Sequence, residues 1–158
     1  MVLVASALAS SLESGWLVPD GGSYPSSPSE SGDAFAAAVS SWFSGATAGA
    51  FPCGTATARR TQLASAATSA LQAGDANAAG SQLALALMSY LAGQVFGPGM
   101  ANPPIAVAAA GSALGSAFAN RDQSASSRAS AIASAVQTLT ASTIVVFPPV
   151  ISAPAPVS

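Results

Sequence analysis

The sequence predicts an all-α protein: a compact bundle of five to six Ala/Ser-rich helices with long Pro/Gly loops and an extended C-terminal arm. Larger apolar residues recur three and four positions apart among small ones, which is the spacing of one helix face. Gly, Pro and Ser gather between these stretches, where they interrupt regular structure. The 158 residues suit a single domain. We expect a helical domain over residues 1–142 and the arm over residues 143–158.

The N-terminal part is expected to hold two helices. The first covers residues 2–14, and Gly15 ends it. A loop rich in Pro, Gly and Ser follows over residues 16–31. The second helix covers residues 32–44 and has the clearest amphipathic stripe of the chain, which we expect to face the core. This stripe consists of Phe35, Val39, Trp42 and Phe43. A further loop is expected over residues 45–54.

The next two helices are expected over residues 57–73 and from Ala76 to Phe96. Thr57 is a candidate N-cap for the former and Asp75 for the latter, because a short side-chain oxygen can accept a hydrogen bond from the first turn. Gly74 stands between the two helices as a C-terminal stop.

Two more helices complete the expected bundle. One begins at the Pro103-Pro104 step and ends at Asn120, and the other is opened by Asp122 or Ser124 and ends near Ser142. The former contains Gly111-x-x-x-Gly115. In a soluble helix these small residues predict a close helix crossing, because no side chain holds the two backbones apart.

The C-terminal arm has a different pattern. Residues 143–147 are β-branched or aromatic and favour an extended strand, and the prolines that follow exclude a helix. Such a segment has no core of its own to join. We therefore expect it to dock on a neighbouring subunit by adding a strand to an exposed sheet edge.

Charge is the most unusual property of the composition. The chain has no lysine and no histidine, and its four Arg and six Asp or Glu make up 6% of the residues, against about a quarter in a typical domain. The mean hydropathy is +0.51. Such a surface keeps monomers apart poorly, so we expect the protein to work in an assembly with copies of itself and other structural proteins. A net charge of −2 also gives no basic patch for direct nucleic-acid binding.

Membrane insertion is disfavoured by the length of the apolar runs. Residues 83–96 and 105–118 are the longest runs, and both are shorter than the roughly 20 residues that a span requires. Glycines and prolines separate them. The N-terminal segment has no basic residue before Arg59, so we interpret it as a structural helix and not as a signal peptide. A small holin-like membrane hairpin remains an alternative.

The residue types that most catalytic sites need are missing. Without histidine the chain cannot form a Ser-His-Asp or Cys-His site, and without lysine it cannot form a Walker-type phosphate site. Cys53 is the single cysteine, which excludes an intramolecular disulfide and a usual zinc site. The six carboxylates fall at predicted helix ends and in loops, where they act as caps. We expect no enzyme, no catalytic residue, no cofactor and no metal.

Candidate interface residues come from the loops and the arm. Large apolar side chains there have no helix stripe to join, so they fold back on the core or insert into neighbouring subunits. The Arg59-Arg60 pair either binds a carboxylate of a partner or solvates the start of a helix. The candidates are Trp16, Tyr24, Phe51, Arg59, Arg60, Ile144, Val146, Phe147, Val150 and Ile151.

In general character the chain resembles the structural proteins of tailed-bacteriophage virions, such as connector, tail, baseplate and capsid decoration proteins. It is small, helical, poor in charge and without catalytic residue types, and its ends are extended. The resemblance is one of type and includes no family motif, so it implies no residue roles. It implies a non-enzymatic structural component that is assembled into a virion in the host cytoplasm. A silk-type helical assembly domain is an alternative, because spidroin modules are also Ala/Ser-rich bundles.

Overall fold

The structure, a computed structural model, describes residues 3–18, 23, 25–149 and 153–158. This part of the chain is mostly helical but also contains two small antiparallel sheets, so the expected all-α class is correct only in part. The α-helices are α1 (Ala5–Leu12), α2 (Pro28–Phe43), α3 (Arg60–Leu71), α4 (Ala76–Leu91), α5 (Val107–Ala119) and α6 (Ala125–Ala141). The strands are β1 (Thr47–Ala48), β2 (Phe51–Pro52), β3 (Val95–Phe96), β4 (Gly99–Ala101), β5 (Ile144–Val146) and β6 (Ala155–Pro156).

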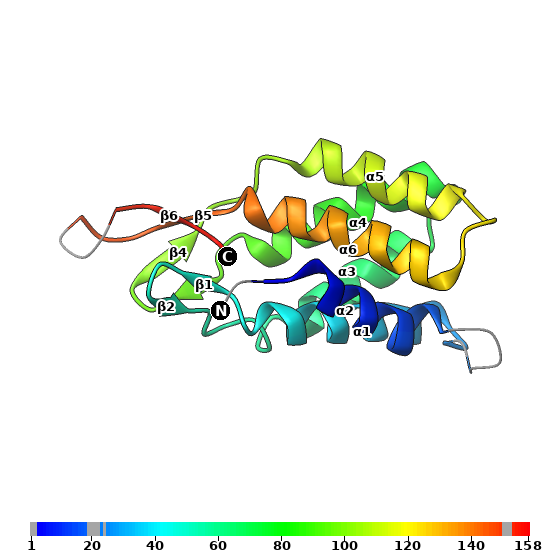
Figure 1. Cartoon of the computed structure of the whole chain (residues 1–158), viewed down its shortest axis with the longest axis horizontal. Coiled ribbons are helices and arrows are strands. Elements are labelled where there is room, and N and C mark those ends of the chain that lie inside the picture. Colours follow the sequence, from blue (N-terminus) through cyan, green and yellow to red (C-terminus); the bar gives the residue numbers. More distant parts are fainter. Residues whose placement is uncertain (1–2, 19–22, 24, 150–152) are drawn as a thin grey trace.

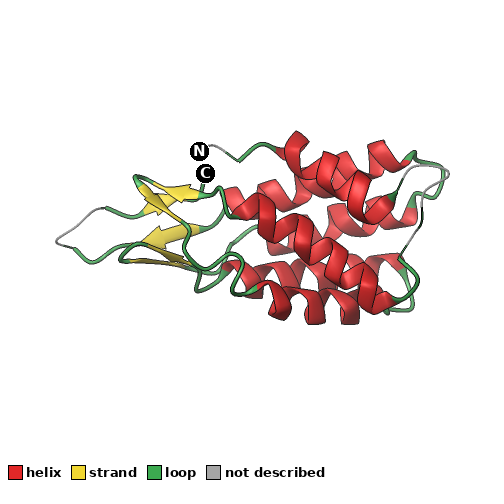
Figure 2. Cartoon of the chain, turned by 90° about the horizontal axis from the view of Figure 1, so that it is seen from below, coloured by secondary structure: helices red, strands yellow, loops and turns green. Residues whose placement is uncertain are grey.

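The helices form a closed ring. Each of them packs against the next one along the chain, and α6 packs against α1 to complete the circle. The strands gather at one end of this ring, as Figures 1 and 2 show. Helices α2, α4 and α6 all end at the strands, so their N-termini lie together at the opposite end of the molecule (Figure 1).

The ring is built from a repeated unit. In the first unit α2 is followed by the hairpin β1–β2 and by α3, and in the second α4 is followed by β3–β4 and by α5. Helices α2 and α4 are both 16 residues long. The third unit consists of α6 and the strands β5 and β6, and α1 takes the place of its following helix by packing on α6. The helix–hairpin–helix arrangement thus occurs twice along the chain, and α6, β5, β6 and α1 reproduce it a third time from the two ends of the chain.

Two segments that were interpreted as loop or helix are hairpins. Residues 45–54 were expected to be a loop, and the helix that now ends at Leu91 was expected to continue to Phe96. A glycine makes each turn possible. Gly49 and Gly97 are the first residues of two-residue turns and have φ of 59° and 57°, where an L side chain is strained. The strands are only two or three residues long, so no alternation in the sequence could reveal them.

The two sheets are joined at both edges into a ring of strands. Within the larger sheet the order is β3–β4–β5–β6. Cys53, just after β2, bridges to Phe96, and Ala48 bridges to Val157 at the other side. Thr47 and Ser158 exchange two backbone hydrogen bonds of 2.9 and 3.0 Å. Each described strand therefore has a neighbour on both sides, which protects sheet edges from pairing with other chains.

Side-chain capping explains the starts of α2, α4 and α6. Asp75 accepts a hydrogen bond from Ala78 N at 2.9 Å, and Ser124 one from Ser127 N at 3.2 Å, as expected for N-caps. Ser27 caps α2 in the same way, so this helix begins at Pro28, earlier than expected. Thr57 is not a cap, because residues 56–59 form a turn and α3 begins at Arg60.

The boundaries of two more helices also differ from the expectation. Helix α5 begins only at Val107, because residues 102–106 around Pro103-Pro104 are not helical, and a proline disfavours helical geometry in the residue before it. After Leu12 the first helix widens into a π-helix, η1 (Glu13–Leu17), so Gly15 does not end it. None of the helices in the described part of the chain is long and apolar enough to cross a membrane.

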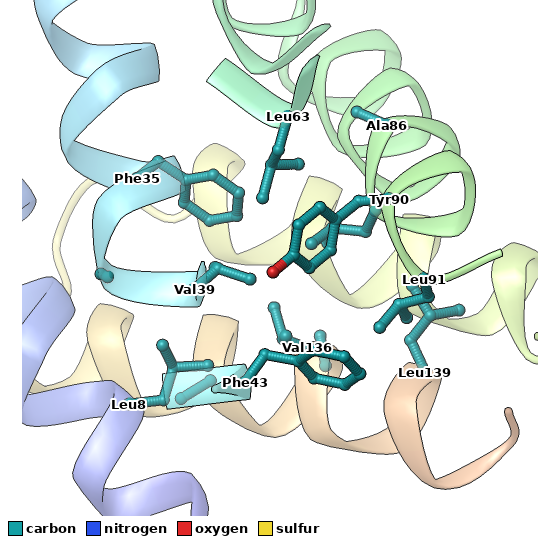
Figure 3. Close-up of a cluster of buried hydrophobic side chains, with 14 of the residues drawn as sticks. Leu8, Phe35, Val39, Phe43, Leu63, Ala86, Tyr90, Leu91, Val136 and Leu139 are labelled. Carbon is teal, nitrogen blue, oxygen red and sulfur yellow. The ribbon is translucent and has the colours of Figure 1, made fainter. Parts of the chain in front are cut away.

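The hydrophobic core lies along the axis of the helix ring. Figure 3 shows side chains from α1, α2, α3, α4 and α6 that meet there, among them Leu8, Phe43, Leu63, Tyr90 and Val136. The rings of Phe43 and Tyr90 are in edge-to-face contact with their centroids 5.8 Å apart. The expected stripe of α2 faces the core: Phe35, Val39 and Phe43 are buried in it, and Trp42 is half-buried and packs against it. Its indole Nε1 donates a hydrogen bond of 3.0 Å to the carbonyl oxygen of Val4, the residue just before α1.

The C-terminal arm pairs with its own chain. The expected strand is present as β5, but it lies between β4 and β6 of the same sheet. Val145, Phe147 and Val157 are buried in the core. We expected this segment to have no core to join and to dock on a neighbouring subunit. For these residues that expectation is wrong, because β5 follows α6 closely and pairs with β4 of the same chain.

Candidate interaction surface

The outer face of the larger sheet is apolar on all four strands. Directly opposed residues share a face, and Val95, Met100 and Val146 are aligned in this way across β3, β4 and β5. Ile144 lies two residues before Val146 on the same face and is opposed by Pro156 of β6. We call these five residues the outer face. A solvated sheet face usually carries polar residues, whereas these five are apolar, and exposed Asn102, whose backbone N donates to Ile144 O at 2.8 Å, lies beside them.

Solvent reaches most of the outer face. The exposed fractions of Met100, Ile144 and Val146 are 59%, 47% and 44%. Val95 is half-buried and Pro156 is exposed. The neighbouring residues on these strands point to the opposite side of the sheet. Phe96, Ala101 and Val145 are among them and belong to the core. The sheet thus separates one apolar face that is buried in the molecule from another that is open to solvent.

Charge is segregated from the outer face. No Asp, Glu or Arg occurs between Ala76 and Asn120 or after Arg128, the two stretches that contain all four strands of this sheet. Most of the described charged residues lie at the other end of the molecule, which we call the charged end, where α2, α4 and α6 begin and α1 ends (Figure 1). They are Glu13, Glu30, Asp33, Asp75, Arg121, Asp122 and Arg128.

Arg59 and Arg60 are the exceptions, and their side chains differ in role. Arg59 donates from Nη2 to Ser89 O at 2.9 Å and from Nη1 to Ala92 O, so it satisfies carbonyls at the C-terminal end of α4. A cation is favourable there because the end of a helix carries partial negative charge. Arg59 is thus occupied within its own chain. Arg60 is exposed and remains a surface residue.

A buried polar cluster lies under the hairpins. The Gln94 side chain is fully buried, and its Oε1 accepts from Thr55 Oγ1 at 2.6 Å and from Cys53 Sγ at 3.5 Å. Burial raises the pKa of the Cys53 thiol and that of Tyr90, whose hydroxyl donates to Ala56 O at 2.9 Å. Cys53 is half-buried, and these side chains are satisfied by hydrogen bonds. The cluster fixes the first hairpin to the second.

A half-open cavity of about 860 Å³ lies at the charged end. Its described lining includes Trp16, Phe118, Arg121, Asp122 and Arg128. The lining mixes two arginines with carboxylates and apolar rings and has no excess of one charge. Among the described residues no three His, Cys, Asp or Glu side chains are grouped as a metal site would require.

The structure divides the sequence-predicted interface candidates into groups. Ile144 and Val146 belong to the outer face. Trp16 and Phe147 are buried, and half-buried Phe51 contacts Phe147 with ring centroids 5.2 Å apart, so these aromatic rings fold back on their own chain. The rings of Trp16 and Phe35 are 5.1 Å apart. Tyr24, Val150 and Ile151 lie outside the described residues.

Three members of the outer face were not found from the sequence. Val95 and Met100 belong to segments interpreted as the end of a helix and the loop after it, and Pro156 to a tail in which no strand was expected. Their strands are too short to show alternation. The signal that was available is the turn glycine Gly97, which marks the hairpin that aligns Val95 with Met100.

The comparisons give no relative from which a function could be inferred. No protein-family model matches the chain, and no similar curated protein or solved structure is found. The class of protein must therefore be argued from the ring of helices, the ring of strands and the uncharged outer face.

Proposed function

We propose that the protein is a non-enzymatic structural component that binds neighbouring subunits of a larger particle through the outer face. The single observation that carries this proposal is the row of exposed apolar side chains formed by Met100, Val146 and Ile144. Exposed apolar patches of this kind mark interaction sites on soluble proteins. Contact with other subunits would remove these side chains from water.

The proposed particle is that of a tailed bacteriophage, with the protein in the connector, the tail or baseplate, or the capsid decoration. Support comes from the general character of the chain: small size, a charged fraction of 6% and no histidine or lysine for common catalytic sites. The partners proposed are copies of the chain and other virion proteins. The protein contacts them with rigid, hydrogen-bonded strands, since the strand ring leaves no described edge open.

Analysis of purified particles tests this proposal. Particles produced from a genome that encodes the chain are purified by density gradient, and the protein is sought by mass spectrometry and by immunogold labelling. We expect it in a fixed ratio to the major capsid protein, with the label at one location. Its absence from particles, together with full infectivity of a deletion mutant, would contradict the proposal. Recovery only in detergent-extracted membranes would instead support the holin-like alternative.

A further inference from the structure

Corresponding elements of the three units stand at a nearly constant spacing in the sequence. The N-caps of α2, α4 and α6 are Ser27, Asp75 and Ser124, which are 48 and 49 positions apart. The strands β1, β3 and β5 begin with the same two spacings. A fixed period marks a repeat architecture. We infer that the chain is a threefold internal repeat closed into a ring, in which the fold does not fix where the ends of the chain lie. This inference is separate from the proposed function.

The turn from helix to strand is the same in all three units. In each unit the residue just before the strand donates a backbone hydrogen bond to the carbonyl three residues earlier. These bonds run from Ala46 to Phe43, from Gln94 to Leu91 and from Thr143 to Thr140, at 2.9, 3.2 and 2.9 Å. All three donor residues are fully buried, although one is apolar and two are polar. Their burial is therefore set by their place in the ring and not by their side chains.

Each hairpin returns to that same buried residue, whose carbonyl accepts a backbone hydrogen bond from the far side of the hairpin. These bonds run from Cys53 N to Ala46 O, from Ala101 N to Gln94 O and from Val157 N to Thr143 O, at 2.9, 2.9 and 3.1 Å. The connection between β5 and β6 is longer than the two glycine turns, so Val157 stands further along the sequence than the period alone gives. The added length leaves the hydrogen-bond pattern intact.

The contact between neighbouring units is also made three times. The residue that follows each hairpin donor binds the first strand of the next unit. These bonds run from Gly54 N to Val95 O, from Asn102 N to Ile144 O and from Ser158 N to Thr47 O, at 2.8, 2.8 and 3.0 Å. The last of them joins the third unit to the first. A ring in which every unit holds the next one in the same way has no first unit.

The core keeps only the apolar character of the repeat. Equivalent buried positions of α2, α4 and α6 hold Phe35, Leu83 and Ile132 and, about one turn later, Val39, Leu87 and Val136. These side chains differ in volume and shape, and a close-packed core accepts each of them only among its own neighbours. The order of the units is therefore fixed by packing, whereas the backbone contacts between units do not depend on which unit comes first.

The ends of the chain occupy a place that the other two units cross covalently. The chain runs from β2 to α3 through residues 53–59 and from β4 to α5 through residues 102–106. The corresponding helix of the third unit is α1, which packs on α6 and precedes all the strands in sequence (Figure 1). By its hydrogen bond to the next unit, Asn102 is the equivalent of Ser158. A chain closed behind Ser158 and opened behind Asn102 therefore keeps the same contacts.

A circular permutant tests this inference on the full set of residues. It begins at Pro103, passes from Ser158 through a short Gly-Ser linker to residue 1, and ends at Asn102. Asn102 and Pro103 are both exposed, so new ends there stay in water. We expect the far-UV circular dichroism of the wild type and cooperative melting within roughly 10 °C of it.

Two further permutants complete the comparison. One is opened between Gly54 and Thr55, the equivalent place in the first unit, and should also melt cooperatively. The other is opened between Ser81 and Gln82, which are exposed but lie within α4, and it should lose cooperative melting. Loss of cooperative melting in both permutants that are opened at equivalent places would overturn the inference.

Amide hydrogen exchange separates a true repeat from simple tolerance of a new end. Groups beside chain ends open most readily, so in the wild type the amides of Val157 and Ser158 should exchange faster than those of Ala101 and Asn102. In the permutant that begins at Pro103 this ranking should reverse, with each pair changing by roughly tenfold or more. A cooperatively melting permutant in which Val157 and Ser158 remain the faster pair would show that the units are not equivalent and would overturn the inference.

Discussion

Gly80 of α4 lies directly against Gly115 of α5. A Cβ atom at Gly80 would be 2.2 Å from Gly115 N and 2.7 Å from Gly111 O, both of them backbone atoms. The Gly111-x-x-x-Gly115 pattern thus marks a close helix crossing, as the sequence predicts. Gly32 has the same place in α2 and contacts Thr68 of α3, so the first unit repeats the crossing of the second.

Replacing Gly80 with alanine should destabilise the protein. The added methyl group meets backbone that cannot turn away, so the helices must separate, at a cost of about 1–3 kcal/mol or more in the free energy of unfolding. Urea unfolding followed by circular dichroism measures this change. Gly15→Ala is the control, because a Cβ there meets nothing within 4 Å. Equal stability of Gly80→Ala and the wild type would show that the crossing is looser than described.

Arg59→Gln should destabilise the protein by about 1–2 kcal/mol, since it removes charged hydrogen bonds from the end of α4. Arg60→Gln removes the same charge from an exposed neighbour and should leave the melting temperature unchanged. Differential scanning calorimetry of both variants measures the difference. If the two melt alike, Arg59 has no special role at the helix end.

Deleting residues 144–158 should unfold the body of the protein. Each of the buried side chains Val145, Phe147 and Val157 contributes about 1.5–3 kcal/mol by burial, so their loss costs about 5 kcal/mol or more. The far-UV helical signal should fall and cooperative melting should disappear. Within the full chain, Val145→Ala should destabilise strongly and Val146→Ala little, because only the former side chain is buried. An intact, cooperatively melting truncated body would mean that the arm is dispensable for folding.

Stability should decrease at alkaline pH. Burial raises the pKa of Tyr90 above its ordinary value of 10.0, so above that pH the unfolded chain loses a proton that the folded chain keeps. The free energy of unfolding then falls by up to about 1.4 kcal/mol per pH unit until the folded pKa is reached. Burial acts on the Cys53 thiol with the same sign from its ordinary value of 9.0 upward.

Urea unfolding between about pH 8 and pH 11 measures this dependence. Tyr90→Phe should flatten the decrease above pH 10, although it also loses the hydrogen bond to Ala56 O. Cys53→Ser separates the contribution of the thiol. A free energy of unfolding that stays constant over this range would show that neither group is buried as described.

The sequence by itself determined the elements that depend on neighbouring residues. Periodic apolar residues predicted the helices, Asp75 and Ser124 marked where two of them begin, and β-branched residues marked the strand at Ile144–Val146. These features arise from interactions within a few residues, so they can be inferred without the rest of the molecule.

The tertiary structure alone decided which segments meet. Strands of two or three residues are stable only beside their partners, so the sequence around Val95 and Met100 does not by itself predict sheet residues. The partner of β5 was expected on a neighbouring subunit and lies in the same chain, because a strand pattern does not specify the edge to which it pairs. Long-range closure of both rings placed Phe147 inside the molecule and left Met100, Ile144 and Val146 on its uncharged outer face.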